Sequence, residues 1–209
     1  MPKMRISVCE VGPIVTNCYL IQNTDTREII VVDPGDSAET ITRAVLEMEG
    51  TVAAVLLTHG HHDHILGLPG LLEKCPAPVY ACSDEKEMLL DPKINMSAFE
   101  GQNVTAEPDV WLEDNEVISM AGFDIRVIHT PGHTRGSCCY YFKEQNILIS
   151  GDTLFRGSVG RTDFPGGSMK QMYGSLHRLL EELPDDTMVF PGHGPATTIE
   201  FEKRNNPFV

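Results

Sequence analysis

The chain has 209 residues, of which 16 are basic and 30 acidic, giving a formal net charge of −14. This balance argues against nucleic acid and membrane surfaces as partners, because both attract proteins through clustered Lys and Arg. No apolar segment reaches the ~20 residues of a membrane helix, and residues 1–8 lack the apolar core of a signal peptide. With six cysteines and no C-x-x-C pair, we expect a cytoplasmic protein with reduced thiols.

The first half of the chain is predicted to alternate strands with helices. Short runs rich in Val and Ile, bounded by turn residues, predict strands over 4–11, 15–21, 28–33, 52–57 and 78–82. Ser37 is the expected N-cap of a helix that Gly50 ends, because apolar side chains recur on one face between them. Further helices are expected over 68–74 and from a cap at 83–85 to residue 90. Residues 91–108 lack clear periodicity, and we expect a short helix and a loop there.

The second half is predicted to be richer in strands. One hairpin is expected over 116–120 and 123–128, and another over 138–142 and 147–150. Ser168 is the expected N-cap of an amphipathic helix that Pro184 ends, followed by a strand over 187–190 and a helical turn over 199–204. This order favours two sheets sandwiched between helices, in a single domain over 1–209.

A dense histidine motif follows the apolar strand 52–57. Thr58-His59-Gly60-His61-His62-Asp63-His64 holds four of the eight histidines of the chain. His133, Asp152 and His193 each follow another predicted strand. Imidazole and carboxylate groups are the ligands of a borderline metal such as zinc. Since strands aligned in sheets deliver their loops to one edge, these side chains are expected to form one metal-binding pocket.

Spacing within the motif predicts two half-sites. His59 and His61 share one side of an extended segment and can hold one ion together. Asp63 and His64 come where the chain turns toward a helix, so they cannot easily reach that same ion. The remaining residues complete the arrangement: His133 adds to one half-site, His193 to the other, and Asp152 can bridge them with its two oxygens.

The other three histidines are not expected to bind metal. His62, inside the motif, is expected to face solvent or to lie behind the ligands. His129 is expected in the core or behind the ligands, and His177 on the surface or in the packing of the late helix.

These motifs resemble those of the metallo-β-lactamase superfamily, whose T-H-x-H-x-D-H pattern appears as Thr58–His64. The stretch from Gly151 to Phe164 and the terminal Asn206-Pro-Phe208 are similar to the short, single-domain bacterial branch of the glyoxalase-II-like hydrolases. The resemblance implies an α+β fold, the four-layer αββα sandwich, which agrees with the predicted order of elements.

The resemblance also implies roles for individual residues. The first metal would be bound by His59, His61 and His133, and the second by Asp63, His64 and His193, with Asp152 bridging. Asp33 and Thr58 would support these ligands from behind. The implied cofactors are two divalent metal ions, zinc first, with iron or a mixed zinc–iron pair as alternatives. Asp63 and Asp152 would be catalytic, orienting a metal-bridging hydroxide and accepting its proton.

The implied activity is hydrolysis of a small-molecule thioester of the hydroxyacylglutathione type. Two-domain glyoxalase II enzymes carry a C-terminal helical domain with basic residues for glutathione, and we expect this protein to be without it. Near the C-terminus only Lys203 and Arg204 form a basic pair. Arg161 is expected either near the site or in a surface salt bridge. Both a monomer and a small homo-oligomer are compatible with the sequence.

Alternative functions use the same ligands. Gly160-Arg-Thr-Asp-Phe164 also resembles the persulfide dioxygenases of the superfamily, which bind one iron through the equivalents of His59, His133 and Asp152. Hydrolysis of another ester or a lactone, and a non-catalytic metal-binding role, are the remaining alternatives.

Overall fold

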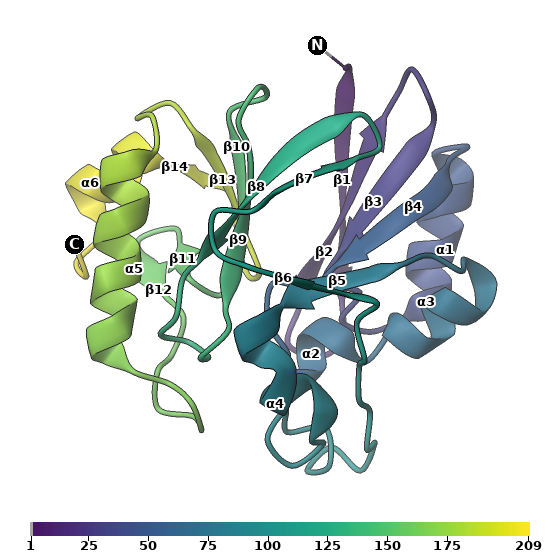
Figure 1. Cartoon of the computed structure of the whole chain (residues 1–209), viewed down its shortest axis with the longest axis horizontal. Coiled ribbons are helices and arrows are strands. Elements are labelled where there is room, and N and C mark those ends of the chain that lie inside the picture. Colours follow the sequence, from purple (N-terminus) through teal and green to yellow (C-terminus); the bar gives the residue numbers. More distant parts are fainter. Residues whose placement is uncertain (1) are drawn as a thin grey trace.

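The computed structural model describes residues 2–209 and places two six-stranded sheets face to face (Figure 1). The first sheet keeps its strands in chain order: β1 (Met4–Val11), β2 (Thr16–Asn23), β3 (Glu28–Val32), β4 (Thr51–Leu56), β5 (Val79–Cys82) and β6 (Val110–Leu112). β1 to β3 pair antiparallel, whereas β3 to β6 pair parallel. Parallel neighbours need crossover connections, which here contain the helices α1 (Ala38–Glu47), α2 (His62–Ile65), α3 (Leu68–Lys74) and α4 (Lys86–Leu90).

The second sheet is mostly antiparallel. Its spatial order is β14 (Thr197–Thr198), β13 (Met188–Pro191), β10 (Ile147–Gly151), β9 (Cys138–Phe142), β8 (Phe123–His129) and β7 (Val117–Met120). Only β10 and β13 pair parallel, and the connection between them contains α5 (Met169–Glu182). The short strands β11 (Leu154–Phe155) and β12 (Ser158–Val159) form a separate hairpin, and α6 (Ile199–Asn205) follows β14.

Three apolar clusters define four layers. Alternating side chains of β3 illustrate the division, because Val31 packs toward α1 and α3 while Ile30 and Val32 pack between the sheets. The third cluster joins the second sheet to α5 and α6 (Figure 1). After the exposed Thr51, β4 is apolar because it is covered on both faces. The predicted α+β fold with αββα layers is therefore confirmed.

Local predictions at helix ends were confirmed only in part. Ser37 occupies the N-cap position of α1, as predicted, but it has φ +48° and its side chain makes no capping hydrogen bond. By contrast, Ser168 Oγ accepts a hydrogen bond from Gln171 N at 3.4 Å, as an N-cap should. The segment at 83–85 is a separate 3₁₀ helix, η1 (Ser83–Glu85), before α4.

Residues 91–108 contain turns and no helix. The side chains of Asn95 and Ser97 organise this segment by hydrogen bonds to the backbone of Val104, so local polar bonds replace a helical ladder. Within residues 2–209, moreover, every helix falls short of the length and apolar character required to cross a membrane.

The packing of α5 predicts a measurable stability effect. Leu179 is fully buried in the third cluster, so Leu179→Ala should lower the free energy of unfolding by roughly 2–5 kcal/mol through lost contacts and a cavity. Tyr173 lies on the same helix and is 44% exposed, so Tyr173→Ala should change it by less than about 1 kcal/mol. Urea unfolding followed by circular dichroism measures both, and equal shifts would contradict the layer assignment.

Candidate metal centre

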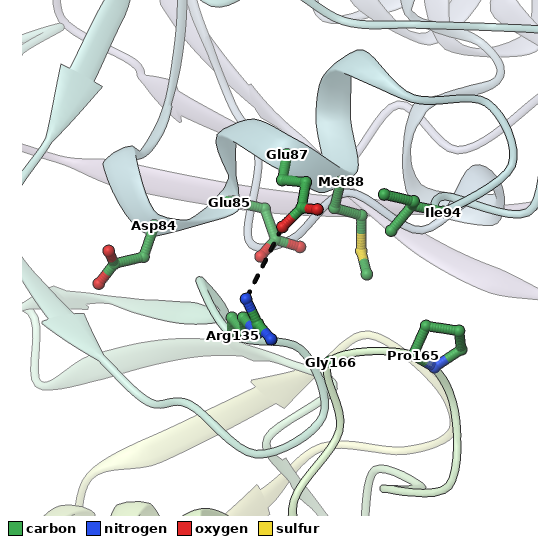
Figure 2. A pocket seen from close by; sticks show the side chains of 8 residues that line it. All are labelled: Asp84, Glu85, Glu87, Met88, Ile94, Arg135, Pro165 and Gly166. Carbon is green, nitrogen blue, oxygen red and sulfur yellow. Dashed lines mark ion pairs between the residues drawn. The ribbon is translucent and has the colours of Figure 1, made fainter.

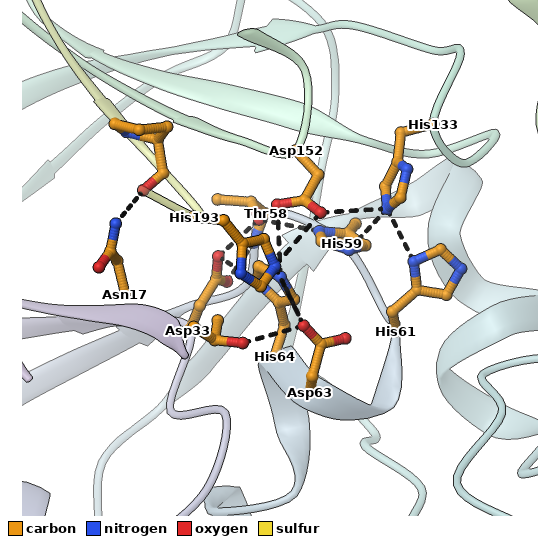
Figure 3. Close-up of polar contacts among 12 residues, drawn as sticks. Asn17, Asp33, Thr58, His59, His61, Asp63, His64, His133, Asp152 and His193 are labelled. Carbon is orange, nitrogen blue, oxygen red and sulfur yellow. Dashed lines mark hydrogen bonds and ion pairs between the residues drawn. The ribbon is translucent and has the colours of Figure 1, made fainter. Parts of the chain in front are cut away.

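Four strand ends place their polar side chains at one edge of the sandwich (Figure 3). Residues 58–64 follow β4, His133 follows β8, Asp152 follows β10 and His193 follows β13. His61 has extended backbone, with φ −61° and ψ 148°, and α2 begins at the next residue. Asp63 therefore lies on the first turn of α2 and points away from the extended segment, as the spacing predicted.

The first group of donors consists of three buried imidazoles. His133 Nε2 lies 2.8 Å from His61 Nδ1 and 3.2 Å from His59 Nε2. Their nitrogens fall within 4.8 Å of one another, close enough to share one ion. Each comes from a loop held by a strand end, so the backbone fixes the direction from which each imidazole approaches.

A second group lies beside it and contains Asp63, His64 and His193. Asp63 Oδ2 is 3.3 Å from His64 Nε2 and 3.2 Å from His193 Nε2. His64 is fully buried, whereas the His193 side chain is 26% exposed and borders the opening. A carboxylate and two imidazoles are a suitable ligand set for zinc or iron.

Asp152 lies between the two groups (Figure 3). Its Oδ2 is 3.5 Å from both His133 Nε2 and His193 Nε2, and its Oδ1 is 3.4 Å from His64 Nε2. Gly192 allows this approach, because a Cβ there would lie 2.2 Å from Asp152 Oδ1. The structure thus brings together all seven residues that the sequence analysis named as ligands.

Asp33 and Thr58 fix which nitrogens face inward. Asp33 Oδ2 lies 2.9 Å from His64 Nδ1 and accepts from Thr58 Oγ1 at 2.6 Å, while Oδ1 accepts from Thr58 N at 2.8 Å. The carboxylate is an acceptor, so His64 carries its proton on Nδ1. Because the Thr58 hydroxyl donates to Asp33, its oxygen accepts from His59 Nδ1 at 3.1 Å. The Nε2 lone pairs of His59 and His64 therefore face the donor groups.

Two further contacts were not predicted from the sequence. Thr16 Oγ1 donates to Asp63 Oδ2 at 2.9 Å, and His133 Nδ1 lies 2.7 Å from the carbonyl oxygen of Arg161. A carbonyl only accepts, so His133 also presents an Nε2 lone pair to the site. Arg161 makes this contact through its backbone carbonyl, so any residue type at this position could make it and the sequence does not indicate it. Thr16 reaches the site because it pairs with His193 in a β-bridge.

Electrostatics differ between the two groups. Burial lowers the pKa of His61 to about 3 and that of His59 well below its ordinary value, and neighbouring imidazoles lower both further. Burial alone would raise the pKa of Asp63 and Asp152, but the nearby imidazoles, His64 foremost, outweigh it and hold both below their usual range. In the second group the carboxylates outweigh burial: burial alone would lower the pKa of His64 and His193, but Asp63 and Asp152 hold both above the ordinary value. Metal binding requires neutral imidazoles and ionised carboxylates, so an ion on the second group would displace protons from His64 and His193.

The donor set fits divalent metal ions. In the first group, His59 Nε2 and His133 Nε2 both present lone pairs and lie 3.2 Å apart, so they repel each other unless a cation lies between them. In the second group, His64 Nε2 and Asp152 Oδ1 are buried without a hydrogen-bond partner among the described residues. Such orphaned polar atoms are rare, and coordination to an ion would satisfy both.

A cavity of about 460 Å³ opens above the donors. Apolar side chains form much of its wall, including Ile14, Met96, Phe155 and Phe164. Arg161 lies on the rim, paired with Asp163 at 2.7 Å and stacked 3.7 Å from the centre of the Phe164 ring. Arg161 therefore lies near the site and also forms a surface salt bridge, so both alternatives expected from the sequence are met.

The remaining histidines lie outside the donor groups. His62 is half-buried and lines the cavity. His129 is also half-buried and bonds the Arg135 carbonyl at 2.8 Å, so its prediction as a core residue was wrong. His177 is exposed on α5, as expected for a surface residue.

Comparison with curated proteins supports a metallo-hydrolase. The probable metallo-hydrolase YqgX of Bacillus subtilis is 40% identical over 201 residues, covering 95% of this chain and 94% of the relative. Hydroxyacylglutathione hydrolase GloC of Haemophilus influenzae is 35% identical over 210 residues, covering 99% of this chain and 98% of the relative.

Solved structures agree along the whole chain. The BLEG-1 B3 metallo-beta-lactamase superposes with a TM-score of 0.92 at 39% identity, covering 98% of this chain and 99% of the other. TTHA1623 in a di-iron-bound form gives 0.86 at 35% identity, with 97% and 100% covered. ETHE1 from Myxococcus xanthus gives 0.78 at 31% identity, with 98% and 84% covered.

The model of the metallo-beta-lactamase superfamily matches residues 11–193, a range that contains all seven candidate ligands. The order of the layers, the two adjoining donor groups and the agreement over nearly the full length of the relatives all point the same way. The chain belongs to the metallo-beta-lactamase superfamily and is a metallo-hydrolase of that superfamily.

Proposed function

We propose that this chain is a binuclear thioester hydrolase acting on S-acyl thiol esters of the hydroxyacylglutathione type. The observation that carries the proposal is the pair of donor groups sharing Asp152, since its Oδ2 lies 3.5 Å from a histidine of each group, His133 and His193, and its Oδ1 lies 3.4 Å from His64 of the second group. The likeness to a relative named as a hydroxyacylglutathione hydrolase supports the substrate class.

Two divalent ions are the proposed cofactors, zinc first, with iron or a zinc–iron pair as alternatives. His59, His61 and His133 would hold one ion, and Asp63, His64 and His193 the other, with Asp152 between them. Such ions lower the pKa of water to about 7 and polarise a carbonyl oxygen. The similar di-iron structure keeps iron among the candidates.

The carboxylates supply the proton chemistry. Asp63 and Asp152 stay ionised near neutral pH, so each can accept a hydrogen bond from an attacking water and orient it. Thr16 holds Asp63 Oδ2 by a hydrogen bond of 2.9 Å, which limits rotation of that carboxylate. A thiolate leaves without a strong general acid because the pKa of a thiol is only about 8.5.

The cavity wall suits a substrate with an apolar body. Phe155 and Phe164 flank the donors from the two sides, and the Phe164 ring lies 5.8 Å from the His61 ring, centre to centre. These side chains would exclude water from one side of the acyl group. The paired charges of Arg161 and Asp163 would face the solvent-exposed part of the thiol.

A mononuclear iron persulfide dioxygenase is the second candidate. His133 Nε2 lies 3.2 Å from His59 Nε2 and 3.5 Å from Asp152 Oδ2, so these three side chains alone form a two-histidine, one-carboxylate set. That set is typical of non-haem iron oxygenases. Gly160–Phe164, which resembles the corresponding stretch of the dioxygenases, lines the same cavity through Arg161 and Phe164.

Metal content and turnover test the proposal together. Protein purified without chelators should contain near two equivalents of zinc, or of zinc and iron, and should hydrolyse thioesters faster than esters, lactones or β-lactams. One equivalent of iron, with oxygen uptake that depends on a persulfide, would overturn it in favour of the dioxygenase. Elemental mass spectrometry, a thioester panel and an oxygen electrode supply the readouts.

Two alanine variants separate the candidates. His59→Ala removes a ligand common to both reactions, whereas Asp63→Ala removes one that only the binuclear hydrolase needs. We expect each to lower thioester hydrolysis by at least roughly 100-fold, the scale of a lost catalytic group. The exposed Asp25→Ala is the control and should retain the wild-type rate. An Asp63→Ala protein with near-full turnover would contradict the binuclear assignment.

The variant Asp33→Asn tests whether the hydrogen bonds of Asp33 to Thr58 and His64 orient the metal ligands. The new amide nitrogen donates where Thr58 or His64 already donates, so at least one of these bonds is lost. We expect metal affinity to fall by roughly 10–100-fold, as is typical for partners behind metal ligands. Competition titration with a chromogenic chelator measures this, and an unchanged affinity would show that Asp33 does not orient the ligands.

A further inference from the structure

We propose that Glu85 is a positioning residue that sets the distance between the two loops carrying the first donor group. These are the His59 loop (residues 57–61) and the His133 loop (residues 130–137). The inference rests on the proposed function and deepens it, because it names the residue that keeps the three imidazoles of the first donor group at their mutual distances.

The Glu85 carboxylate bonds to both loops at once. Oε1 accepts from the backbone N–H of Gly60 at 2.8 Å, in the His59 loop. Oε2 accepts from Thr134 Oγ1 at 2.9 Å and from the backbone N–H of Gly136 at 2.8 Å, in the His133 loop. One carboxylate therefore joins two segments that are distant in the chain, since Gly60 and Thr134 are 74 residues apart.

Two of these three bonds are made by residues next to a donor histidine. Gly60 stands between His59 and His61, and Thr134 directly follows His133. The 2.8 Å separation of His61 Nδ1 and His133 Nε2 spans the same two loops. A change in the length or charge at Glu85 would therefore act on the separation of these imidazoles, although Glu85 is not itself a ligand.

The packing leaves the carboxylate no other position. Glu85 is 1% exposed and belongs to η1, just after β5. The backbone of Gly136 is so close to η1 that an added Cβ would lie 2.1 Å from Glu85 N. Gly60 packs against Met88 and Leu89 of α4, where an added Cβ would meet their side chains at 3.0 Å. Both glycines allow backbone to approach the carboxylate closely.

The three hydrogen-bond donors to the Glu85 carboxylate are neutral groups, and the charged side chains nearby pair with each other or lie to one side. Figure 2 shows Arg135 turned toward Glu87, to which it is paired at 3.7 Å, while Asp84 lies to one side. These residues line a cavity of about 160 Å³ on the outer side of Glu85. Burial raises the pKa of Glu85 to about 7, against the three hydrogen bonds, which favour the ionised form. Its interactions are thus with the two loops and not with a counter-ion.

Glu202 provides a matched comparison. It is also a fully buried carboxylate with three hydrogen bonds, from Gly157 N, Thr197 Oγ1 and Asn206 Nδ2. None of these partners adjoins a donor histidine. Loss of Glu202 should destabilise the packing of α6 in the way that loss of any buried carboxylate would, without acting on the metal ligands.

The test is cobalt binding to metal-free Glu85→Gln and Glu202→Gln. Gln keeps the size of Glu, but its amide nitrogen cannot accept from a backbone N–H or a hydroxyl. We expect Glu85→Gln to weaken one of the two cobalt-binding steps by roughly 10–100-fold and to alter the visible absorption of that step, leaving the other unchanged. Glu202→Gln should lower the melting temperature but leave both steps within about threefold of wild type.

Two results would overturn the proposal. One is wild-type cobalt affinity in Glu85→Gln, and the other is an equal loss in Glu202→Gln, which would show a general effect of destabilisation. If Glu85→Gln does not fold, Thr134→Val removes only one of the three bonds, and Thr134→Ser should restore binding. Cobalt binding is measured without turnover, so the result does not depend on which substrate the enzyme hydrolyses.

Discussion

The site requires several buried imidazoles to lie close together with the lone pairs of their nitrogens facing one another. Nitrogens that share a cation repel each other without it, so the scaffold must supply the force that keeps them together. It does so by giving the outward nitrogens of three histidines a fixed acceptor: the Thr58 hydroxyl for His59, Asp33 for His64 and the Arg161 carbonyl for His133. Each hydrogen bond fixes both the tautomer and the ring orientation.

Backbone geometry adds to this rigidity. Asp33 has φ +50°, a left-handed conformation uncommon for residues other than glycine, and it directly follows β3, where its carboxylate turns under Thr58. Gly35 follows, and an added Cβ there would lie 1.8 Å from the carbonyl oxygen of Asp63. The first turn of α2 is therefore pressed against the end of β3. Strain and close contact occur together at this position because the surrounding structure determines it fully.

The sequence predicted those parts of the site that depend on local order. Extended backbone at His61 followed by the start of α2 is a local property, and it places Asp63 away from His61. The partner of Asp63 was not predictable, because Thr16 reaches it only through a β-bridge to His193 across the two sheets. Tertiary contacts of this kind leave no pattern within a single segment.

The same distinction explains the errors in the fold. β11, β12 and β14 are two residues long, too short for alternation to be detected, and they exist because longer neighbours or a turn bring them into pairing. Ser37 has the residue type of an N-cap, but its left-handed backbone directs the side chain elsewhere. The four layers were predictable because they rest on long apolar runs such as β4 and on the amphipathic face of α5.

The difference in charge between the two donor groups bears on which reaction they serve. The first group contains imidazoles alone, while the second contains Asp63 and adjoins Asp152, with Asp33 behind His64. Asp63 raises the pKa of His64 and His193, and these imidazoles balance its charge only while they are protonated. Buried charges are costly unless they are paired, and a second divalent ion would balance the carboxylates while leaving both imidazoles neutral and able to coordinate. This pairing is the physical reason for proposing a second cation beside Asp152, and with it a binuclear hydrolase over a mononuclear oxygenase.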